Sequence, residues 1–252
     1  MAEAHLDALR SSVSHLRNVV STVSEADLTS RAYPSEWNIA HVLSHLGSGA
    51  VISLRRFDDT LAGLTTPDHH APEVWDTWNA KTPVAQRDDC LAADAALLTR
   101  LEGATLEQRS GYAMSMGPMT FGFTDFVAMR LNEHAFHTWD VEVVRDPEAT
   151  IPSHVAELVV DNLELVARFT AKPTGDTTII TVVTSAPQRG FTVHLTPDTV
   201  TMGTDATAVS ADLELPAEAF ARLVYGRLDP AHTPPGEHGP ALDLLRGVFP
   251  GP

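Results

Sequence analysis

The spacing of apolar residues changes once along this chain, and that change limits the folds it can adopt. Up to about residue 147, apolar side chains recur three and four positions apart, as they do on the buried face of a helix. The first such run contains Leu6, Leu9, Val13, Leu16 and Val20. Further runs predict helices over residues 36–61, 84–101 and 121–144. Four amphipathic helices of this length predict a four-helix bundle.

The connections between these helices carry signals of their own. A turn around residues 33–34 precedes the second helix, for which Ser35 is the expected N-cap. Residues 65–83 contain three prolines and two tryptophans, and we interpret them as a long connection between the second and third helices.

Beyond residue 150 the chain contains short β-branched runs bounded by Gly, Pro and Asp. These runs predict strands over residues 177–184, 190–195, 198–202 and 208–215. Helices are expected over residues 155–169, 216–225 and 240–248. Helices followed by strands in blocks indicate an α+β chain, in which a helical bundle of residues 1–148 precedes a smaller α+β domain of residues 149–252.

Charge and cysteine content exclude several classes of function. The 252 residues include 17 Lys and Arg against 33 Asp and Glu, and the formal net charge of −16 opposes binding to nucleic acid or to anionic membranes. A single cysteine cannot form an intrachain disulfide. The first residues lack the pattern of a signal peptide, and no segment has the apolar length of a membrane span, so we expect a cytoplasmic protein.

Histidine and glutamate side chains are spaced as metal ligands on two of the predicted helices. His41 and His45 are four residues apart on the second helix, and Glu133 and His137 are four apart on the fourth, with His134 between them. Residues at this spacing lie on one helix face. Catalytic zinc takes three protein ligands of the imidazole and carboxylate type and keeps one open position. One ligand from one helix and two from another would meet that number in a bundle core.

Ionisable residues also interrupt the apolar stripe of the fourth helix. The stripe contains Phe126, Arg130, Glu133, His137, Asp140 and Val144. Ionised groups on a core face must be paired, bound to metal or placed in a wet pocket. Alternatively, Arg130 and Glu133 form a simple ion pair, and His41 and His134 are surface residues or partners of the ligands. The small residues 47–50 that follow His45 either leave room for a ligand or allow close helix packing.

Three stretches resemble the mycothiol-dependent maleylpyruvate isomerase family. They are SEWNIAHVLSHLG (residues 35–47), MTFGFTDFVAMRLNEHAFHTWDVEV (119–143) and VSADLELPAEAFARLVYGR (209–227). The resemblance implies a DinB-like metal-binding four-helix bundle followed by a small α+β domain. It also implies that His45, Glu133 and His137 bind a divalent metal, usually zinc. The family further uses an arginine of the C-terminal domain, for which Arg227 and Arg222 are the candidates.

The resemblance implies an enzyme that uses the low-molecular-weight thiol mycothiol against a small electrophile. A metal with an open position promotes the thiolate form of a bound thiol, which is the reactive species. Cys90 is not part of the motif and is interpreted as a small buried hydrophobe, so the sulfur would come from mycothiol. An isomerase would release the thiol after the double bond has rotated, whereas an S-transferase would leave it attached. Arg227, or Arg130 as a cofactor-binding residue, could hold a carboxylate.

Two other functions remain open from the sequence. A non-catalytic module that binds a thiol or another ligand would keep the pocket without turnover. A metal-dependent hydrolase would activate water at the open metal position and would act without thiol.

Overall fold

The computed structural model describes residues 2–205 and 211–251, which divide into two compact units, Met1–Asp146 and Pro147–Pro252. These limits lie close to the expected boundary between residues 148 and 149. The division of the chain into domains of residues 1–148 and 149–252 stays a prediction. Among the described helices, none is long and apolar enough to cross a bilayer.

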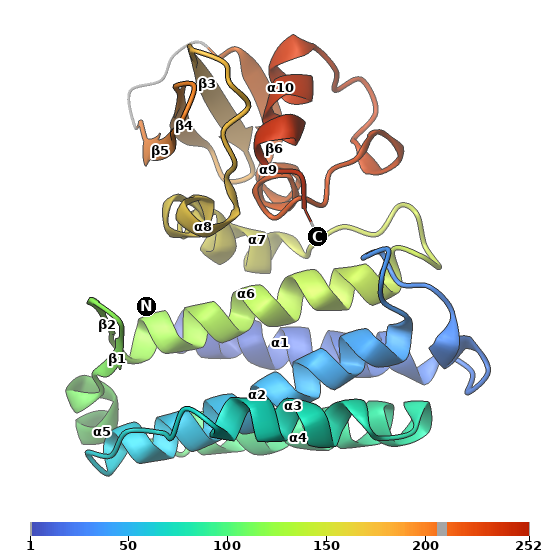
Figure 1. Ribbon diagram of the computed structural model, residues 1–252, viewed down its shortest axis with the longest axis vertical. Helices are drawn as coiled ribbons and strands as arrows, with labels where there is room; N and C mark the ends of the chain where they lie inside the picture. The colour runs from blue at the N-terminus through green and yellow to red at the C-terminus, as the bar shows by residue number, and fades with distance from the viewer. Residues whose placement is uncertain (1, 206–210, 252) are drawn as a thin grey trace. The chain divides into compact units, whose positions relative to one another are not determined.

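Four long helices form the first unit and confirm the predicted bundle (Figure 1). They are α1 (Ala2–Ser21), α2 (Ile39–Leu61), α4 (Pro83–Glu102) and α6 (Phe123–Glu142). Helix α2 packs against α4 and α6, and α1 packs against the same two helices. The shorter elements are η1 (Asp27–Thr29), α5 (Leu106–Gly111) and an antiparallel hairpin of β1 (Met114–Met116) and β2 (Met119–Phe121).

The expected start of the second helix was wrong by one turn. Helix α2 begins at Ile39 with Asn38, not Ser35, as its N-cap. The Asn38 side chain accepts a hydrogen bond from the His41 backbone N–H at 2.8 Å, and the His41 ring nitrogen faces the Asn38 N–H at 3.5 Å. This reciprocal capping arrangement places His41 in the first turn of α2.

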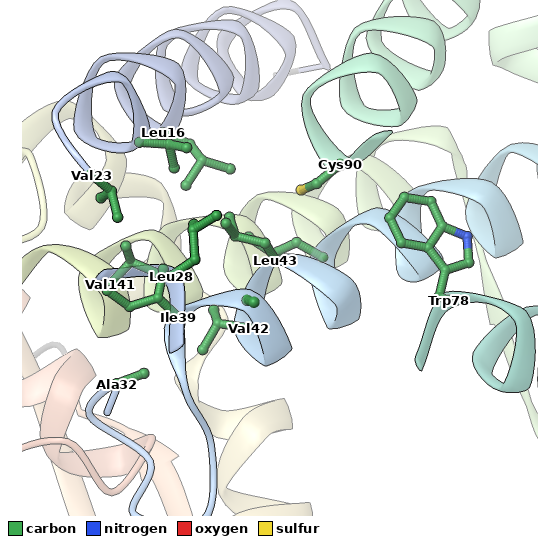
Figure 2. Packing of buried hydrophobic residues seen from close by; sticks show 13 residues of the cluster. Leu16, Val23, Leu28, Ala32, Ile39, Val42, Leu43, Trp78, Cys90 and Val141 are labelled. Carbon is green, nitrogen blue, oxygen red and sulfur yellow. The ribbon is translucent and has the colours of Figure 1, made fainter. Parts of the chain in front are cut away.

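Residues 65–83 connect α2 to α4 as expected, but the sequence did not predict that helix α3 (His70–Asn79) forms within this connection. Pro72 is compatible with this helix since it lies in the first turn, where a backbone N–H has no intrahelical acceptor. Trp78 is buried in the apolar cluster that contains Leu43 and Cys90 (Figure 2). The packing of this indole against the bundle stabilises a helix that the local sequence pattern does not indicate.

The second unit has the predicted α+β composition. Its sheet has the order β5-β4-β3-β6, with β3 antiparallel to β4 and parallel to β6. The strands are β3 (Thr178–Ser185), β4 (Arg189–Leu195), β5 (Val200–Thr204) and β6 (Leu213–Pro216). Of the strand expected over 208–215, residues 208–210 lie outside the described residues.

Helices accompany this sheet within the second unit. The single helix expected over residues 155–169 is two helices, α7 (Ser153–Val160) and α8 (Leu163–Thr170), which are separated at residues 161–162. Helix α9 (Ala217–Val224) contacts α7 and α8, and α8 contacts β5. The remaining elements are η2 (Pro230–His232) and α10 (Pro240–Val248).

Candidate metal centre

Helices α2 and α6 bring three possible metal ligands together in the bundle. The ligand atoms of His45, Glu133 and His137 all lie within 4.8 Å of one another. Nε2 of His45 is 3.1 Å from Oε2 of Glu133, and Nε2 of His137 is 3.7 Å from the same oxygen. The structure therefore brings together the three residues that the sequence singles out. Their role as ligands stays a prediction.

Trp37, which precedes α2, contacts both imidazoles of this group. Its ring centroid is 5.2 Å from that of His45 and 5.9 Å from that of His137. The two imidazole centroids are 4.6 Å apart. The indole therefore limits the positions that both imidazole rings can adopt.

Asp140 holds the third member of the group from inside the bundle. Its carboxylate is fully buried, and its Oδ2 atom lies 2.8 Å from Nδ1 of His137. Because Nδ1 contacts Asp140, the other ring nitrogen, Nε2, faces Glu133. A histidine that binds a metal usually has this arrangement, with one ring nitrogen on the metal and the other on a carboxylate or carbonyl. The buried stripe of α6 ends here, because Val144 lies beyond the helix and is exposed rather than buried.

The Glu133 carboxyl is held in its ionised form. Burial by itself would raise its pKa, but the hydrogen bond to His45 and the electrostatic interactions with His137, His45 and Arg130 outweigh this effect and lower the pKa to about 2. Its side chain keeps 49% of its surface exposed. An ionised carboxylate that remains accessible is suited to bind a cation.

The two other histidines of these helices have different surroundings. His41 is exposed and takes part in the cap of α2. His134 is fully buried, with Nδ1 2.8 Å from the Ser12 hydroxyl and Nε2 3.2 Å from Oδ2 of Asp94. Among the described residues, neither belongs to the group that could hold a metal.

Arg130 is part of a buried ion pair between α4 and α6. Its Nη2 atom donates to Oδ1 of Asp94 at 2.5 Å and to the Leu46 carbonyl at 2.9 Å. These contacts favour a structural role, and binding of a cofactor by Arg130 stays a prediction.

Cys90 is also buried, and burial together with the Asp94 charge raises the pKa of its thiol well above the ordinary value. The Cys90 thiol is thus unsuited to act as a nucleophile.

The small residues after His45 include one that close packing requires. A Cβ atom on Gly47 would lie 2.2 Å from the Trp78 ring and 2.9 Å from the backbone of Cys90. Gly47 therefore allows α3 and α4 to approach α2, which favours the packing interpretation at this position.

A cavity of about 390 Å³ lies beside the candidate metal centre. It is lined by Glu36, Trp37, His41, His45, Ser48, Trp75 and Asn79. Trp75 and Asn79 are not among the site residues predicted from the sequence, because both lie on α3 in the segment interpreted as a long connection. Their spacing of four residues was the available signal for a shared helix face.

The two candidate arginines lie in the second unit and are both buried. Arg222 forms two hydrogen bonds with Glu218, at 2.7 and 3.0 Å. Arg227 donates to the Tyr225 carbonyl at 2.8 Å. The charge of Arg222 is thus neutralised by a carboxylate on its own helix. The catalytic role expected for Arg227 stays a prediction.

Comparisons with known proteins agree with this architecture. Residues 9–142 match the family described as mycothiol maleylpyruvate isomerase N-terminal domain. The solved structure of a mycothiol-dependent maleylpyruvate isomerase is 16% identical, with a TM-score of 0.65 over 94% of this chain and 96% of that one. A structure of a histidine-to-alanine mutant of that enzyme is 15% identical, with the same TM-score and coverage. At this identity, the two structures support the fold. No curated protein matches significantly.

Proposed function

The chain belongs to the mycothiol maleylpyruvate isomerase N-terminal domain family, and from that membership we propose that it is a metal-dependent enzyme that uses mycothiol. The proposed substrate is a small electrophile to which the thiol is added. In an isomerisation the thiol would be released again, and in a transfer it would stay attached. The convergence of His45, Glu133 and His137 within 4.8 Å carries this proposal.

The donor set fits a divalent ion, zinc in the first place. Two imidazole nitrogens and one carboxylate oxygen are the ligand types and the number found at catalytic zinc. Asp140 would fix the ring of His137 so that Nε2 faces the ion. When bound, a divalent ion with an open position favours the deprotonated form of a thiol.

Other residues of the chain support binding and orientation. Trp37 would keep both imidazoles in place through its ring contacts. Arg227 is the proposed catalytic residue and the proposed partner for a carboxylate of the electrophile, and Arg222, which is hydrogen-bonded to Glu218, is the second candidate.

Metal analysis tests the first step of this proposal. We expect about one zinc per chain in protein purified without chelator. His45→Ala should lose the metal. His41→Ala, which removes the same side chain one turn earlier on α2, should keep it. Wild-type protein without any divalent ion, or equal metal content in both variants, would contradict the proposed centre.

Activity assays with and without mycothiol test the second step. Zinc-loaded protein should convert electrophiles only in the presence of the thiol. Recovery of free thiol with a rearranged substrate would identify an isomerase, and a stable thioether would identify a transferase. Turnover without thiol would instead favour a hydrolase, and binding without turnover a ligand-binding module.

A further inference from the structure

We infer that a second cavity in the first unit binds a small monocarboxylic acid with an apolar chain. The cavity has a volume of about 380 Å³, which lies within the range of small-molecule sites. It is formed by the last turns of α2, the loop of residues 63–66 and residues 113–116, which contain β1. The described residues that line it include none of the three candidate metal ligands.

This second cavity is separate from the candidate metal centre. Arg56, which lines the cavity, follows His45 by eleven residues on the same helix. An α-helix rises 1.5 Å per residue, so the two positions are about 16 Å apart along the axis of α2. A ligand in the second cavity would therefore not touch the metal centre.

Both walls of the second cavity are held against α2. On one side, the buried Asp59 carboxylate accepts a hydrogen bond from the Thr66 hydroxyl at 2.8 Å. The Asp59 carbonyl accepts from the Leu64 N–H, also at 2.8 Å. On the other side, the Tyr112 ring stacks on Phe57 with the centroids 5.0 Å apart, which places the residues that follow Tyr112 beside α2. The shape of the cavity is thus set by the packing of the bundle.

Arg56 supplies a positive charge that the protein itself does not neutralise. The two acidic residues nearest to it in sequence are already paired, Asp58 with Arg100 at 2.8 Å and Asp59 with Arg55 at 2.7 Å. Within the part of the chain that the structure describes, the exposed guanidinium of Arg56 forms no ion pair. A guanidinium binds a carboxylate through two parallel hydrogen bonds, so Arg56 is suited to hold the head group of an acid.

The polar part of the cavity matches a single negative charge. Thr60 lies one turn after Arg56 on the same face of α2, and its hydroxyl can donate a further hydrogen bond. Among the described residues that line the cavity, Arg56 is the only charged one. A dicarboxylate or a phosphate would bring additional negative charge without a cationic partner. The cavity therefore favours a monocarboxylate.

The rest of the lining is suited to an apolar chain. Leu64 is 62% exposed and Met116 is 41% exposed, although both are large apolar side chains. Covering such surface is favourable by about 25 cal/mol per Å². Methionine side chains also adapt to ligands of different shape. An acid whose carboxylate binds Arg56 and whose chain covers Leu64 and Met116 would use both parts of the cavity.

Binding of octanoate tests the inference. Octanamide is the uncharged probe of the same length, and acetate is the acid without the chain. Calorimetric titration of the full-length protein should show one octanoate per chain, bound at least about tenfold more tightly than either of the other two compounds. Leu64→Ser should weaken octanoate binding, while the preference over octanamide remains.

Variants of two exposed arginines identify the charge that binds the acid. Arg56→Gln should abolish the preference for octanoate over octanamide. Arg56→Lys should keep part of it, because the charge remains while the paired hydrogen bonds are lost. Arg17→Gln removes an exposed arginine from α1, outside the cavity, and should leave octanoate binding unchanged.

The inference does not depend on the proposed function, and the experiment separates the two. A carboxylate can also bind zinc, so the titration is repeated with His45→Ala and with protein treated with a chelator. Both should bind octanoate as the wild type does. Loss of binding in His45→Ala would place the acid at the candidate metal centre and overturn the inference. Binding that Arg56→Gln leaves unchanged, or no saturable binding below about 10 mM octanoate, would overturn it as well.

Discussion

Nδ1 of His137 lies 2.8 Å from Oδ2 of Asp140, three residues further along α6. Asp140 is fully buried, so this contact is shielded from water and comes from inside the bundle. One of the three candidate ligands, His137, is consequently held in place from the bundle core.

Asp140→Asn should weaken zinc binding by about 10- to 100-fold, because outer partners of a ligating histidine fix its tautomer and ring orientation. Competition with a chromophoric zinc chelator measures the dissociation constant. Asp125→Asn is the matched control on the same helix, where the carboxylate caps the Gly122 backbone N–H. Equal zinc affinity in Asp140→Asn and the wild type would show that Asp140 does not orient His137.

The buried pair of Asp94 and Arg130 should be important for stability. Asp94→Asn leaves the guanidinium buried without a charged partner, which typically costs about 3–5 kcal/mol in the free energy of unfolding. Urea denaturation measures this loss. Asp89→Asn, which removes an exposed carboxylate from the same helix, should change the value by less than about 1 kcal/mol. Similar values for the two variants would rule out a stabilising role for the buried pair.

Gly47→Ala should destabilise the first unit, because the added methyl group would overlap Trp78 and approach the backbone of Cys90. Overpacking of this kind costs about 1–3 kcal/mol. In Gly111→Ala the new Cβ atom has no neighbour within 4 Å, so no loss is expected from packing. Thermal unfolding of both variants checks the difference. A Gly47→Ala protein as stable as the wild type would mean that α3 moves away from α2 at little cost.

The ion pair of His15 and Glu142 predicts a pH dependence of stability. Nε2 of His15 lies 2.7 Å from the Glu142 carboxylate, and this hydrogen bond raises the pKa of His15 above its ordinary value of 6.5, although burial opposes the shift. A group whose pKa is raised on folding stabilises the folded protein at pH values below the pKa that the group has in the unfolded chain. This stabilisation is lost as the pH rises through the pKa that the group has in the folded protein.

His15→Gln should therefore differ most from the wild type at about pH 6 and least at about pH 9. Urea denaturation across this range measures the difference in the free energy of unfolding. Glu142→Gln should remove the same dependence, since it removes the charge that holds the proton on His15. A difference between wild type and His15→Gln that does not change with pH would contradict the ion pair.

Much of the candidate site followed from local sequence alone. Glu133 and His137 share one face of α6 because residues four apart do so in any α-helix. The same rule could not choose between His41 and His45, which are also four apart on α2. The family resemblance pointed to His45, and in the structure the cap at Asn38 places His41 in the exposed first turn.

Helix α3 shows the limit of the local pattern most clearly. Three prolines between residues 65 and 83 indicated an irregular segment, yet ten residues of it are helical. In proteins, helical stability comes mainly from tertiary packing, and here Trp78 provides it by burial against α2 and α4. Trp75 and Asn79 could be recognised as cavity residues only once that packing was known.

The sequence by itself determined the helical period of the bundle, the strands of the second unit and the residue types that can bind a metal. These properties depend on neighbours a few positions apart along the chain. Only the tertiary structure decided that Arg130 pairs with Asp94, that His134 is buried in a polar network and that His45 meets the two candidate ligands of α6. Each of these contacts joins different helices, and the distances between helices are set by the packing of side chains from the whole bundle.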